Sequence, residues 1–260
     1  MSFYDLRSGL CRGAVVLSML AAAACSSYAE EDEGDEGDGL GAAAAMLNLK
    51  DANTLMEDSD FEGDQDVTVA DVQAVLNLKK SPLATYKVGT RTAAQIIVEE
   101  SIAQKISPVF MVARIQTEQA LITSRTNIDN LESATGCGCH DAKKCAAVYR
   151  GFDKQVKCTA TKFREYFDNL RQGLAPASGV KPNANDTNVY MIGRKTLTED
   201  PLRSGRKGCS VTPTNAATAA VLTYTPYVGV NVTNACPSTQ VGGAGLQIRV
   251  LENVREWMGR

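Results

Sequence analysis

One glutamate, Glu118, stands in a sequence context suited to proton transfer, near the end of a mostly aliphatic segment. If that segment is helical, its glutamate-bearing face also carries Ile115, Leu121 and Ile122. Burying an ionised carboxylate among apolar groups is costly, so such surroundings favour the protonated form. A carboxyl group that stays protonated near neutral pH is what a general acid needs to cleave a glycosidic bond. We therefore interpret Glu118 as a candidate general acid.

An ion pair is the alternative role for this glutamate. Arg114 precedes it by one helical turn, and carboxylate and guanidinium groups at this spacing pair on many helices. In that case Glu118 would be structural, and the segment would carry no catalytic group. The residues of the segment leave both interpretations open.

An acidic segment further upstream has the ligand spacing of an EF-hand calcium loop. Oxygen-bearing side chains recur at alternating positions of the segment 60–71, with the apolar Val67 between them and an apolar helix pattern after them. Ca²⁺ prefers several oxygen ligands that converge from such positions, so we predict a Ca²⁺ site here. Its ligands would come from Asp60, Glu62, Asp64, Asp66, Thr68 and Asp71.

A short motif that follows this segment also occurs upstream of it. Residues 45–50, Ala-Met-Leu-Asn-Leu-Lys, recur at 74–79 as Ala-Val-Leu-Asn-Leu-Lys, and each copy follows an acidic stretch. The duplicated loop and helix, within about residues 31–80, resemble a dockerin. The resemblance implies Ca²⁺ at the second loop and a protein partner for the repeat. The alternative is a solvated acidic linker that ends in a short amphipathic helix.

The candidate groups need a scaffold, and the apolar spacing of the chain predicts a mainly helical, α+β one. Ser107 followed by Pro108 is a typical helix start. The serine side chain can cap the first turn, and proline fits the first helical position because an N–H there would have no partner within the helix. The residues of the region 181–213 predict turns and short strands. Helices are expected at 92–105, 108–123, 156–170, 215–224 and 245–258.

The start of the chain predicts export. Basic residues precede an apolar run at 13–24 that is too short for a stable membrane span, so we expect residues 1–24 to be a removable signal peptide. The small residues before Cys25 resemble a bacterial lipobox. That resemblance implies acylation of Cys25 and a lipid anchor to the membrane of the cell envelope, and cleavage by a general secretory peptidase is the alternative. Residues 25–39 are acidic and poor in apolar groups, which is typical of a solvated tether.

Composition narrows the protein class. The 260 residues are 44% apolar and 22% charged with a net charge of −3, so nothing predicts nucleic-acid binding. Six of the 8 cysteines follow residue 136 without the spacing of a zinc site, and His140 is the only histidine. In an exported protein these cysteines predict three disulfides. We expect one main domain at 83–260 after a dockerin-like segment at 40–82.

The segment around Glu118 resembles the catalytic helix of lytic transglycosylases and goose-type lysozymes. It shares a Ser-Pro or Asn-Pro start, aliphatic filling and a Gln-x-Glu-Gln/Ser-x-Leu end. Three further motifs occur in the same order in a group of exported bacterial surface proteins that are similar to lysozyme-like proteins. They are Ala134-Thr-Gly-Cys-Gly-Cys139 with Cys145, Tyr149-Arg-Gly-Phe-Asp-Lys-Gln155, and Thr218-Ala-Ala-Val-Leu-Thr-Tyr-Thr-Pro-Tyr227. From about Ile106 to the C-terminus, the resemblance implies a lysozyme-like fold with Glu118 as the general acid.

The same resemblance implies residues that contact the substrate. The stretch 149–155 corresponds to a Gly-Leu-Met-Gln-like stretch that lines the transglycosylase cleft, which makes Tyr149 and Gln155 candidates for substrate binding. Tyr224 and Tyr227 correspond to a tyrosine region whose hydroxyl helps to hold the acid or the N-acetyl group. Ordinary core packing with a hydrogen-bonded hydroxyl is the alternative role for both tyrosines.

The disulfide pairing is a hypothesis that draws on this resemblance. One bond would close a short loop after the Ala134 motif, and another would clamp the expected helix 215–224 and the loop after it. The related group has other residues at Cys137 and Cys158, and the joint presence of both cysteines suggests that they pair. The expected bonds join Cys137 to Cys158, Cys139 to Cys145 and Cys209 to Cys236, although sequence alone does not choose among the pairings.

The expected reaction is cleavage of a glycan, with peptidoglycan as the leading substrate and no cofactor for catalysis. A second carboxylate opposite Glu118 is not identifiable, although Asp129, Glu132 and Asp141 lie in the region after it. The resemblance implies a single-acid scheme, in which Glu118 protonates the glycosidic oxygen and then helps the sugar's own hydroxyl to attack the anomeric carbon. A muramidase or another polysaccharide hydrolase, which would use water, is the alternative enzyme. A non-catalytic, calcium-ordered envelope-binding module is the alternative from another class.

Overall fold

The computed structural model describes residues 50–139, 145–177, 189–199, 207–229, 232–233 and 243–260. The expected signal peptide at 1–24 and the expected tether at 25–39, with Cys25, lie outside the described residues. His140, Asp141 and Cys236 lie outside them as well. Within the described ranges, no helix is both long enough and apolar enough to span a membrane.

The described chain is mainly helical, which confirms the expected class. The α-helices are α2 (Asp58–Glu62), α3 (Val69–Leu78), α4 (Ala93–Ala103), α5 (Pro108–Gln119), α6 (Phe152–Arg171), α7 (Ala216–Tyr224) and α8 (Gly243–Trp257), and the 3-10 helices are η1 (Pro82–Ala84), η2 (Asn127–Ser133) and η3 (Ala147–Tyr149). The short strands pair as β1 (Lys50–Asp51) with β6 (Val232–Thr233), β2 (Lys87–Val88) with β3 (Arg91–Thr92), and β4 (Thr196–Glu199) with β5 (Lys207–Val211). The first pair is parallel and the other two are antiparallel.

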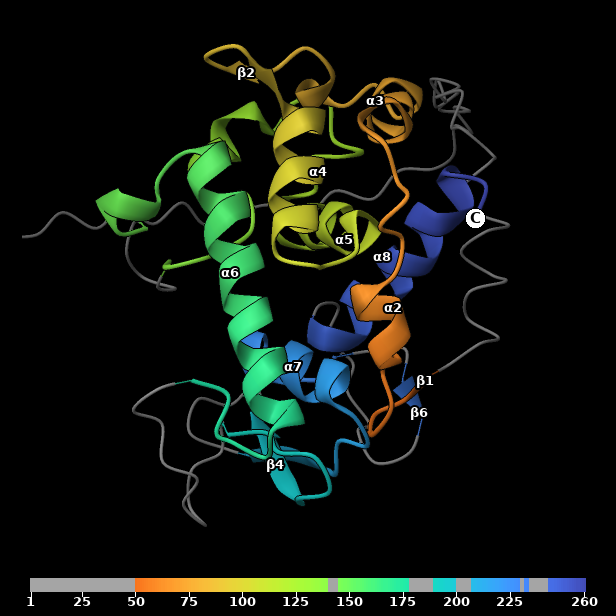
Figure 1. Ribbon diagram of the computed structural model, residues 1–260, viewed down its shortest axis with the longest axis vertical. Helices are drawn as coiled ribbons and strands as arrows, with labels where there is room; N and C mark the ends of the chain where they lie inside the picture. Colours follow the sequence, from red (N-terminus) through yellow and green to blue (C-terminus); the bar gives the residue numbers. More distant parts are fainter. Residues whose placement is uncertain (1–49, 140–144, 178–188, 200–206, 230–231, 234–242) are drawn as a thin grey trace, which may run out of the picture. The chain divides into compact units, whose positions relative to one another are not determined.

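Helix α5 is the buried centre of the fold. Its cap forms as the sequence predicts, because the Ser107 hydroxyl accepts the backbone N–H of Phe110 at 3.1 Å. Every residue from Pro108 to Ile115 is buried, so other elements pack around all sides of this helix. Helices α4 and α8 both pack against it, as Figure 1 shows.

The end of α5 differs from the expectation. The sequence predicts a helix to residue 123, but α5 ends at Gln119, because Ala120 adopts the left-handed conformation with a φ of 52°. Leu121 and Ile122 are buried, but they follow the helix and do not lie on its Glu118 face. The expected apolar face around Glu118 is therefore wrong for these two residues.

Helix α6 runs along one side of the bundle (Figure 1). The sequence predicts it from residue 156, and the helix starts one turn earlier, at Phe152, after Gly151 at a φ of 113°. Glycine adopts this backbone conformation without the steric cost that other residues have. The apolar face of α6 packs against α4 and α7, and its polar face is exposed.

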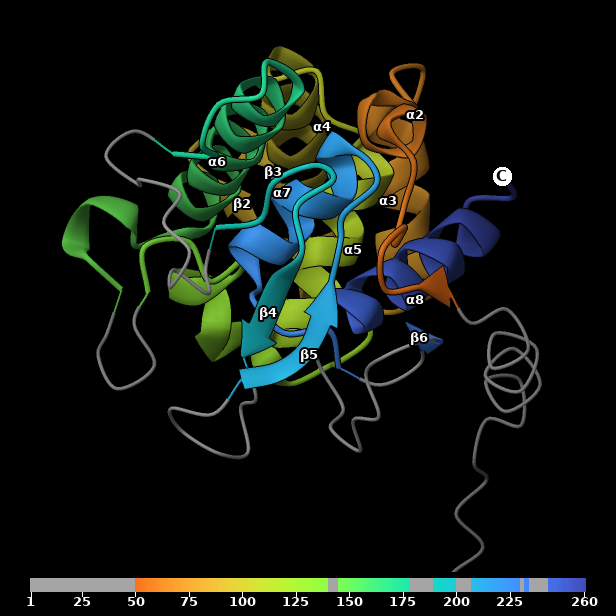
Figure 2. The same ribbon diagram turned by 90° about the horizontal axis from the view of Figure 1, so that it is seen from below.

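The antiparallel pair of β4 and β5 follows α6 in the chain, and helix α7 comes after it. The Asn215 side chain caps α7 by accepting the backbone N–H of Thr218 at 2.9 Å. In the hairpin, Thr196 lies opposite Val211, and Figure 2 shows the two strands side by side. Both strands fall in the region 181–213, where the sequence predicts short strands.

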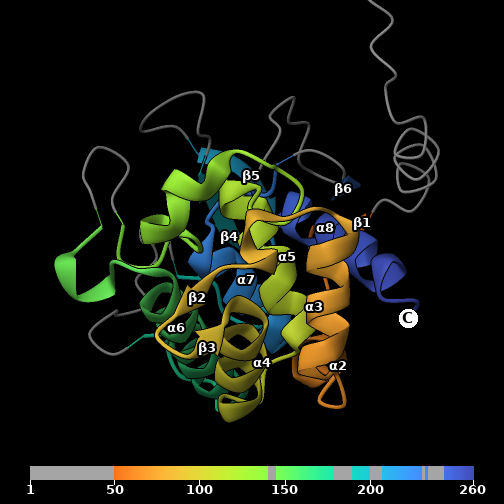
Figure 3. The same cartoon turned by 90° about the horizontal axis from the view of Figure 1, so that it is seen from above.

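The segment before residue 83 shares the hydrophobic core of the helical bundle. Phe61 of α2 stacks on Phe167 with 4.5 Å between ring centroids and meets Phe110 edge-on at 5.3 Å. Helix α3 packs against α4, and Figure 3 shows α2 and α3 against the bundle. The expected domain boundary at residue 82 is therefore wrong, because one buried cluster runs across it.

Two of the three expected disulfides are confirmed. Cys137 is bonded to Cys158, and Cys139 is bonded to Cys145. Cys209 is also disulfide-bonded, but its expected partner Cys236 lies outside the described residues. The first bond ties the loop before residue 140 to α6, so it fixes that loop against the helix.

Candidate functional site

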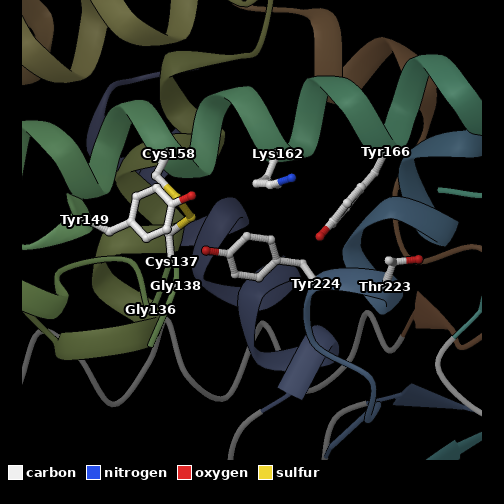
Figure 4. A pocket seen from close by; sticks show the side chains of 9 residues that line it. All are labelled: Gly136, Cys137, Gly138, Tyr149, Cys158, Lys162, Tyr166, Thr223 and Tyr224. Atoms are coloured by element: carbon white, nitrogen blue, oxygen red, sulfur yellow. A yellow bond between two sulfur atoms is a disulfide. The ribbon is translucent and has the colours of Figure 1, made fainter. Parts of the chain in front are cut away.

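A pocket of about 230 Å³ lies between a loop, helix α6 and helix α7. Three tyrosine rings and one lysine surround it, and a disulfide forms part of its wall (Figure 4). It is smaller than the roughly 300–1,000 Å³ of sites for drug-sized ligands. The lining residues are Gly136, Cys137, Gly138, Tyr149, Cys158, Lys162, Tyr166, Thr223 and Tyr224.

Helix α6 supplies one wall through residues one helical turn apart. Cys158, Lys162 and Tyr166 follow each other at four-residue spacing and therefore share a face. A hydrogen bond to Glu165 at 2.8 Å raises the pKa of Lys162, and burial raises the pKa of Tyr166. This wall therefore presents a positive charge and a neutral phenol. The sequence analysis missed Lys162 and Tyr166, although their spacing from Cys158 was the signal that could have found them.

Gln155 does not line the pocket, which corrects its expected role in substrate binding. The residue is fully buried, and its amide nitrogen donates to the carbonyl oxygens of Cys137 at 2.8 Å and Tyr149 at 2.7 Å. Its amide oxygen accepts the backbone N–H of Cys137 at 3.1 Å. Because both of its amide hydrogens and its oxygen are engaged, no ligand can bind it. Gln155 instead positions the loop that carries Gly136 and Gly138.

Tyr224 combines a pocket-lining ring with a hydroxyl held by the protein. The hydroxyl donates to the carbonyl oxygen of Thr135 at 3.1 Å and lies 3.0 Å from the Thr159 hydroxyl. The ring stacks on Phe163 with 4.5 Å between centroids. Burial raises the pKa of Tyr224 to about 12, so the phenol stays neutral at physiological pH. The hydroxyl therefore has the packing role. Phe163 covers one face of the ring and the Arg114 guanidinium covers the other, so Tyr224 meets the pocket with the edge of its ring.

Glu118 forms an ion pair with Arg114, the alternative that the sequence left open. The guanidinium is only 3% exposed, and one of its nitrogens contacts Oε1 of Glu118. Its Nη1 donates to the Thr225 hydroxyl and to the Gln247 side-chain oxygen, both at 2.9 Å. The guanidinium also stacks on the Tyr224 ring, 4.3 Å from its centroid. The carboxylate thus faces a guanidinium instead of the apolar surroundings that we expected.

The Glu118 carboxylate lies at the edge of the pocket. Its second oxygen, Oε2, is close to Gly136, where a Cβ atom would lie 2.6 Å from it. Gly136 and Tyr224 line the pocket, and Tyr224 stacks on the partner of the carboxylate. The Glu118 side chain is 26% exposed, so it is accessible to solvent. The carboxylate thus touches the pocket wall without being one of its lining residues.

The two other predicted tyrosines differ in position. Tyr149 lines the pocket, and its ring lies so close to Gly138 that no side chain fits there. Tyr227 is not part of the lining; it packs on Gly243 at the start of α8, where a Cβ atom would lie 2.7 Å from its carbonyl oxygen. The structure therefore brings Tyr149 and Tyr224 together and leaves Tyr227 outside the site.

The pocket lining contains no carboxylate. Asp129 and Glu132 lie in η2 with exposed side chains, and Asp141 lies outside the described residues. Among the candidate acids that the structure describes, only Glu118 touches the pocket wall.

Three carboxylates of the predicted calcium loop form ion pairs with arginines near the C-terminal end of the chain. Both oxygens of Asp66 contact Arg260, at 3.0 and 2.9 Å. Asp64 lies 3.5 Å from Arg260 and 3.7 Å from Arg255, and Asp60 lies 2.9 Å from Arg255. Guanidinium groups thus occupy the positions in which a cation would meet these oxygens.

The remaining predicted calcium ligands face other partners. Glu62 pairs with Arg164 and Arg171 of α6, at 2.9 and 3.2 Å. Thr68 and Asp71 cap each other at the start of α3. Within the described residues, no group of three or more potential ligands is arranged to hold a metal ion. The side chains as placed do not fit a Ca²⁺ site, and calcium binding stays a prediction.

Comparisons with models of protein families, with curated proteins and with solved structures found no match for the chain.

Proposed function

We propose that the protein is an exported, lysozyme-like enzyme that cleaves a cell-envelope glycan, with peptidoglycan as the leading substrate. The observation that carries the proposal is the position of Glu118, whose Oε2 borders the wall of an aromatic-lined pocket. Tyrosine rings offer flat apolar faces with polar edges, which suit the faces of a sugar ring. The resemblance of the Glu118 helix to that of lytic transglycosylases supports the same assignment.

The two oxygens of Glu118 have different surroundings, so we assign them different roles, positioning for Oε1 and proton transfer for Oε2. Oε1 contacts Arg114, which fixes the carboxyl group at the end of α5. Oε2 lies at Gly136 without a hydrogen bond to another described residue, so we assign the proton transfers to this atom. Proton transfer requires such an oxygen within reach of the reacting group.

The reaction that we propose uses one carboxyl group twice. The protonated Oε2 gives its proton to the glycosidic oxygen as the bond between this oxygen and the anomeric carbon breaks, and the bonding electron pair leaves with the oxygen. The carboxylate then takes a proton from a hydroxyl of the same sugar, whose oxygen bonds to the anomeric carbon. No water is consumed, and the product is an anhydro sugar. Attack by water in place of the hydroxyl would give the muramidase reaction.

A non-catalytic glycan-binding module is the second candidate, and the ion pair of Glu118 is the observation that favours it. The Arg114 guanidinium contacts one oxygen of the carboxyl group that the first step above needs, and a structural ion pair explains this contact without any catalysis. In this alternative the pocket would bind one sugar of an envelope polysaccharide. Glu118 would then only fix Arg114 against Tyr224.

Mass analysis of the fragments that the purified protein releases from peptidoglycan tests the proposal. A lytic transglycosylase gives fragments one water lighter than the products of hydrolysis, and a muramidase gives the hydrated products. A protein that binds the polymer but releases no fragments would support the binding module instead. The export and the lipid anchor at Cys25 are a separate proposal, which mass analysis of the mature N-terminus would test.

A further inference from the structure

The pocket lining carries one charged side chain, Lys162, and no carboxylate. Figure 4 shows this lysine on α6 between Tyr149 and Tyr166, with Tyr224 on the other side of the pocket. Because a hydrogen bond to Glu165 raises the pKa of Lys162, the ammonium group keeps its charge through neutral and mildly alkaline pH. The pocket therefore combines aromatic rings with a positive charge at physiological pH.

With respect to the described residues, the polar groups of the pocket have hydrogen-bonding capacity left for a ligand. An ammonium group has three N–H donors, and Lys162 uses one of them for Glu165, at 2.8 Å. The hydroxyls of Tyr149 and Tyr166 make no hydrogen bond to another described residue. By contrast, the Tyr224 hydroxyl is held by Thr135. The donors available to a ligand thus gather on the side of the pocket that includes Lys162.

We infer that the pocket selects a sugar unit that carries a carboxylate, with Lys162 as the specificity-determining residue. A sugar ring bound against Tyr149 and Tyr166 would place a ring substituent beside the ammonium group, and an anionic substituent would form a charge-assisted hydrogen bond with it. A neutral sugar would stack equally well but would not form this bond. The inference rests on the proposal that the pocket binds a glycan, and it adds the class of sugar.

The charges around Lys162 determine how much more tightly the pocket should bind an acidic sugar than a neutral one. The side chain is 40% exposed and already faces Glu165, so a ligand carboxylate competes with that partner in partly solvated surroundings. We expect an acidic sugar to bind about tenfold more tightly than its neutral counterpart. Removal of the competing charge by Glu165→Gln should widen this ratio. High salt should narrow it, because the pair is exposed enough to be screened.

Calorimetric titration of the full chain with short oligosaccharides tests the inference. The probes are neutral oligomers of N-acetylglucosamine, oligomers of galacturonic acid, and glycan strands that contain muramic acid. The last two distinguish a carboxylate on the sugar ring from one on an ether-linked side chain. Mass analysis after each titration verifies that the ligand is intact.

The inference predicts that Lys162→Met lowers the affinity for acidic oligomers about tenfold more than the affinity for neutral ones, and that the variant melts at the wild-type temperature. Lys157→Met is the matched control, because it removes the same charge from an exposed position of α6 that does not line the pocket. Equal binding of neutral and acidic oligomers by the wild type would overturn the inference and leave the glycan proposal standing. Binding of neither would overturn both. An equal loss in Lys157→Met would show that only net charge acts, which also overturns the role of Lys162.

Discussion

Oε2 of Glu118 lies so close to Gly136 that a Cβ atom on this glycine would be 2.6 Å from it. Gly136 also has a φ of 75°, which other residues adopt at a cost of about 1–2 kcal/mol. The backbone conformation therefore favours glycine at this position, and an added Cβ atom would displace the proposed catalytic group.

Gly136→Ala should lower the rate of glycan cleavage at least about tenfold, because a displacement of the carboxyl group by even 1 Å is expected to have a large effect on rate. Gly173→Ala is the matched control, since Gly173 has a φ of 71° but no atom within 4 Å of the added Cβ. Both variants should lose about 1 kcal/mol or more of stability in chemical denaturation. If the control loses as much activity as Gly136→Ala, backbone strain explains the effect and the contact with Glu118 does not.

Gln155→Leu should destabilise the fold by about 2–4 kcal/mol. The substitution leaves the backbone groups of Cys137 and the carbonyl of Tyr149 without their buried partner, and each unsatisfied group costs about 1–3 kcal/mol. Hydrogen exchange should also accelerate at the Cys137 amide. Wild-type exchange at this amide in the variant would show that the two disulfides hold the loop without Gln155.

The stability of the protein should fall between about pH 10 and pH 12 partly because of Tyr224. Burial raises the pKa of Tyr224 to about 12 in the folded state, against about 10 in the unfolded state. The stabilisation from Tyr224 is complete below the unfolded pKa and is lost as pH rises through the folded pKa. Between the two pKa values, the free energy of unfolding falls by about 1.4 kcal/mol per pH unit.

The Tyr224→Phe variant isolates this contribution, because it lacks the titrating group and keeps the ring. The difference in unfolding free energy between wild type and variant should shrink by roughly 2 kcal/mol over this pH range, as followed by denaturant titration. A constant difference would contradict the burial of the hydroxyl.

Calcium, if it binds at the predicted loop, has to displace Arg260. The guanidinium holds both oxygens of Asp66 and lies 3.5 Å from Asp64. Arg260→Ala should therefore bind Ca²⁺ more tightly than the wild type, by about tenfold or more, in calorimetric titration of chelator-treated protein. The same affinity in both proteins would show that Arg260 does not compete with the ion.

The sequence predicts the helices well where local chemistry sets their ends. Ser107 and Pro108 start α5 as expected, because capping depends on neighbouring residues alone. The end of α5 was not predictable, since Ala120 adopts a left-handed conformation that is usual for glycine and asparagine. The domain boundary also failed, because the contact of Phe61 with Phe167 joins residues far apart in the sequence.

The candidate site was predictable only in part. The pairing of Cys137 with Cys158 and the positions of Tyr149 and Tyr224 at one pocket agree with the sequence analysis. The role of Gln155 was wrong, because a polar residue in a motif can hold a loop as readily as a ligand. The arginine partners of the calcium loop were missed because they come from the far end of the chain, and sequence spacing carries no signal for such contacts.

The release of soluble fragments from peptidoglycan by wild type and by Glu118→Gln tests the proposed activity most directly. The proposal predicts fragments from the wild type and at least about a thousandfold slower release from the variant, because glutamine cannot transfer the proton. Circular dichroism and binding of the intact polymer should be unchanged, and Glu118→Asp, which keeps the charge beside Arg114, serves as a second variant if Glu118→Gln does not fold. Release at the wild-type rate by either folded variant, or no release by the wild type, would contradict the catalytic role of Glu118.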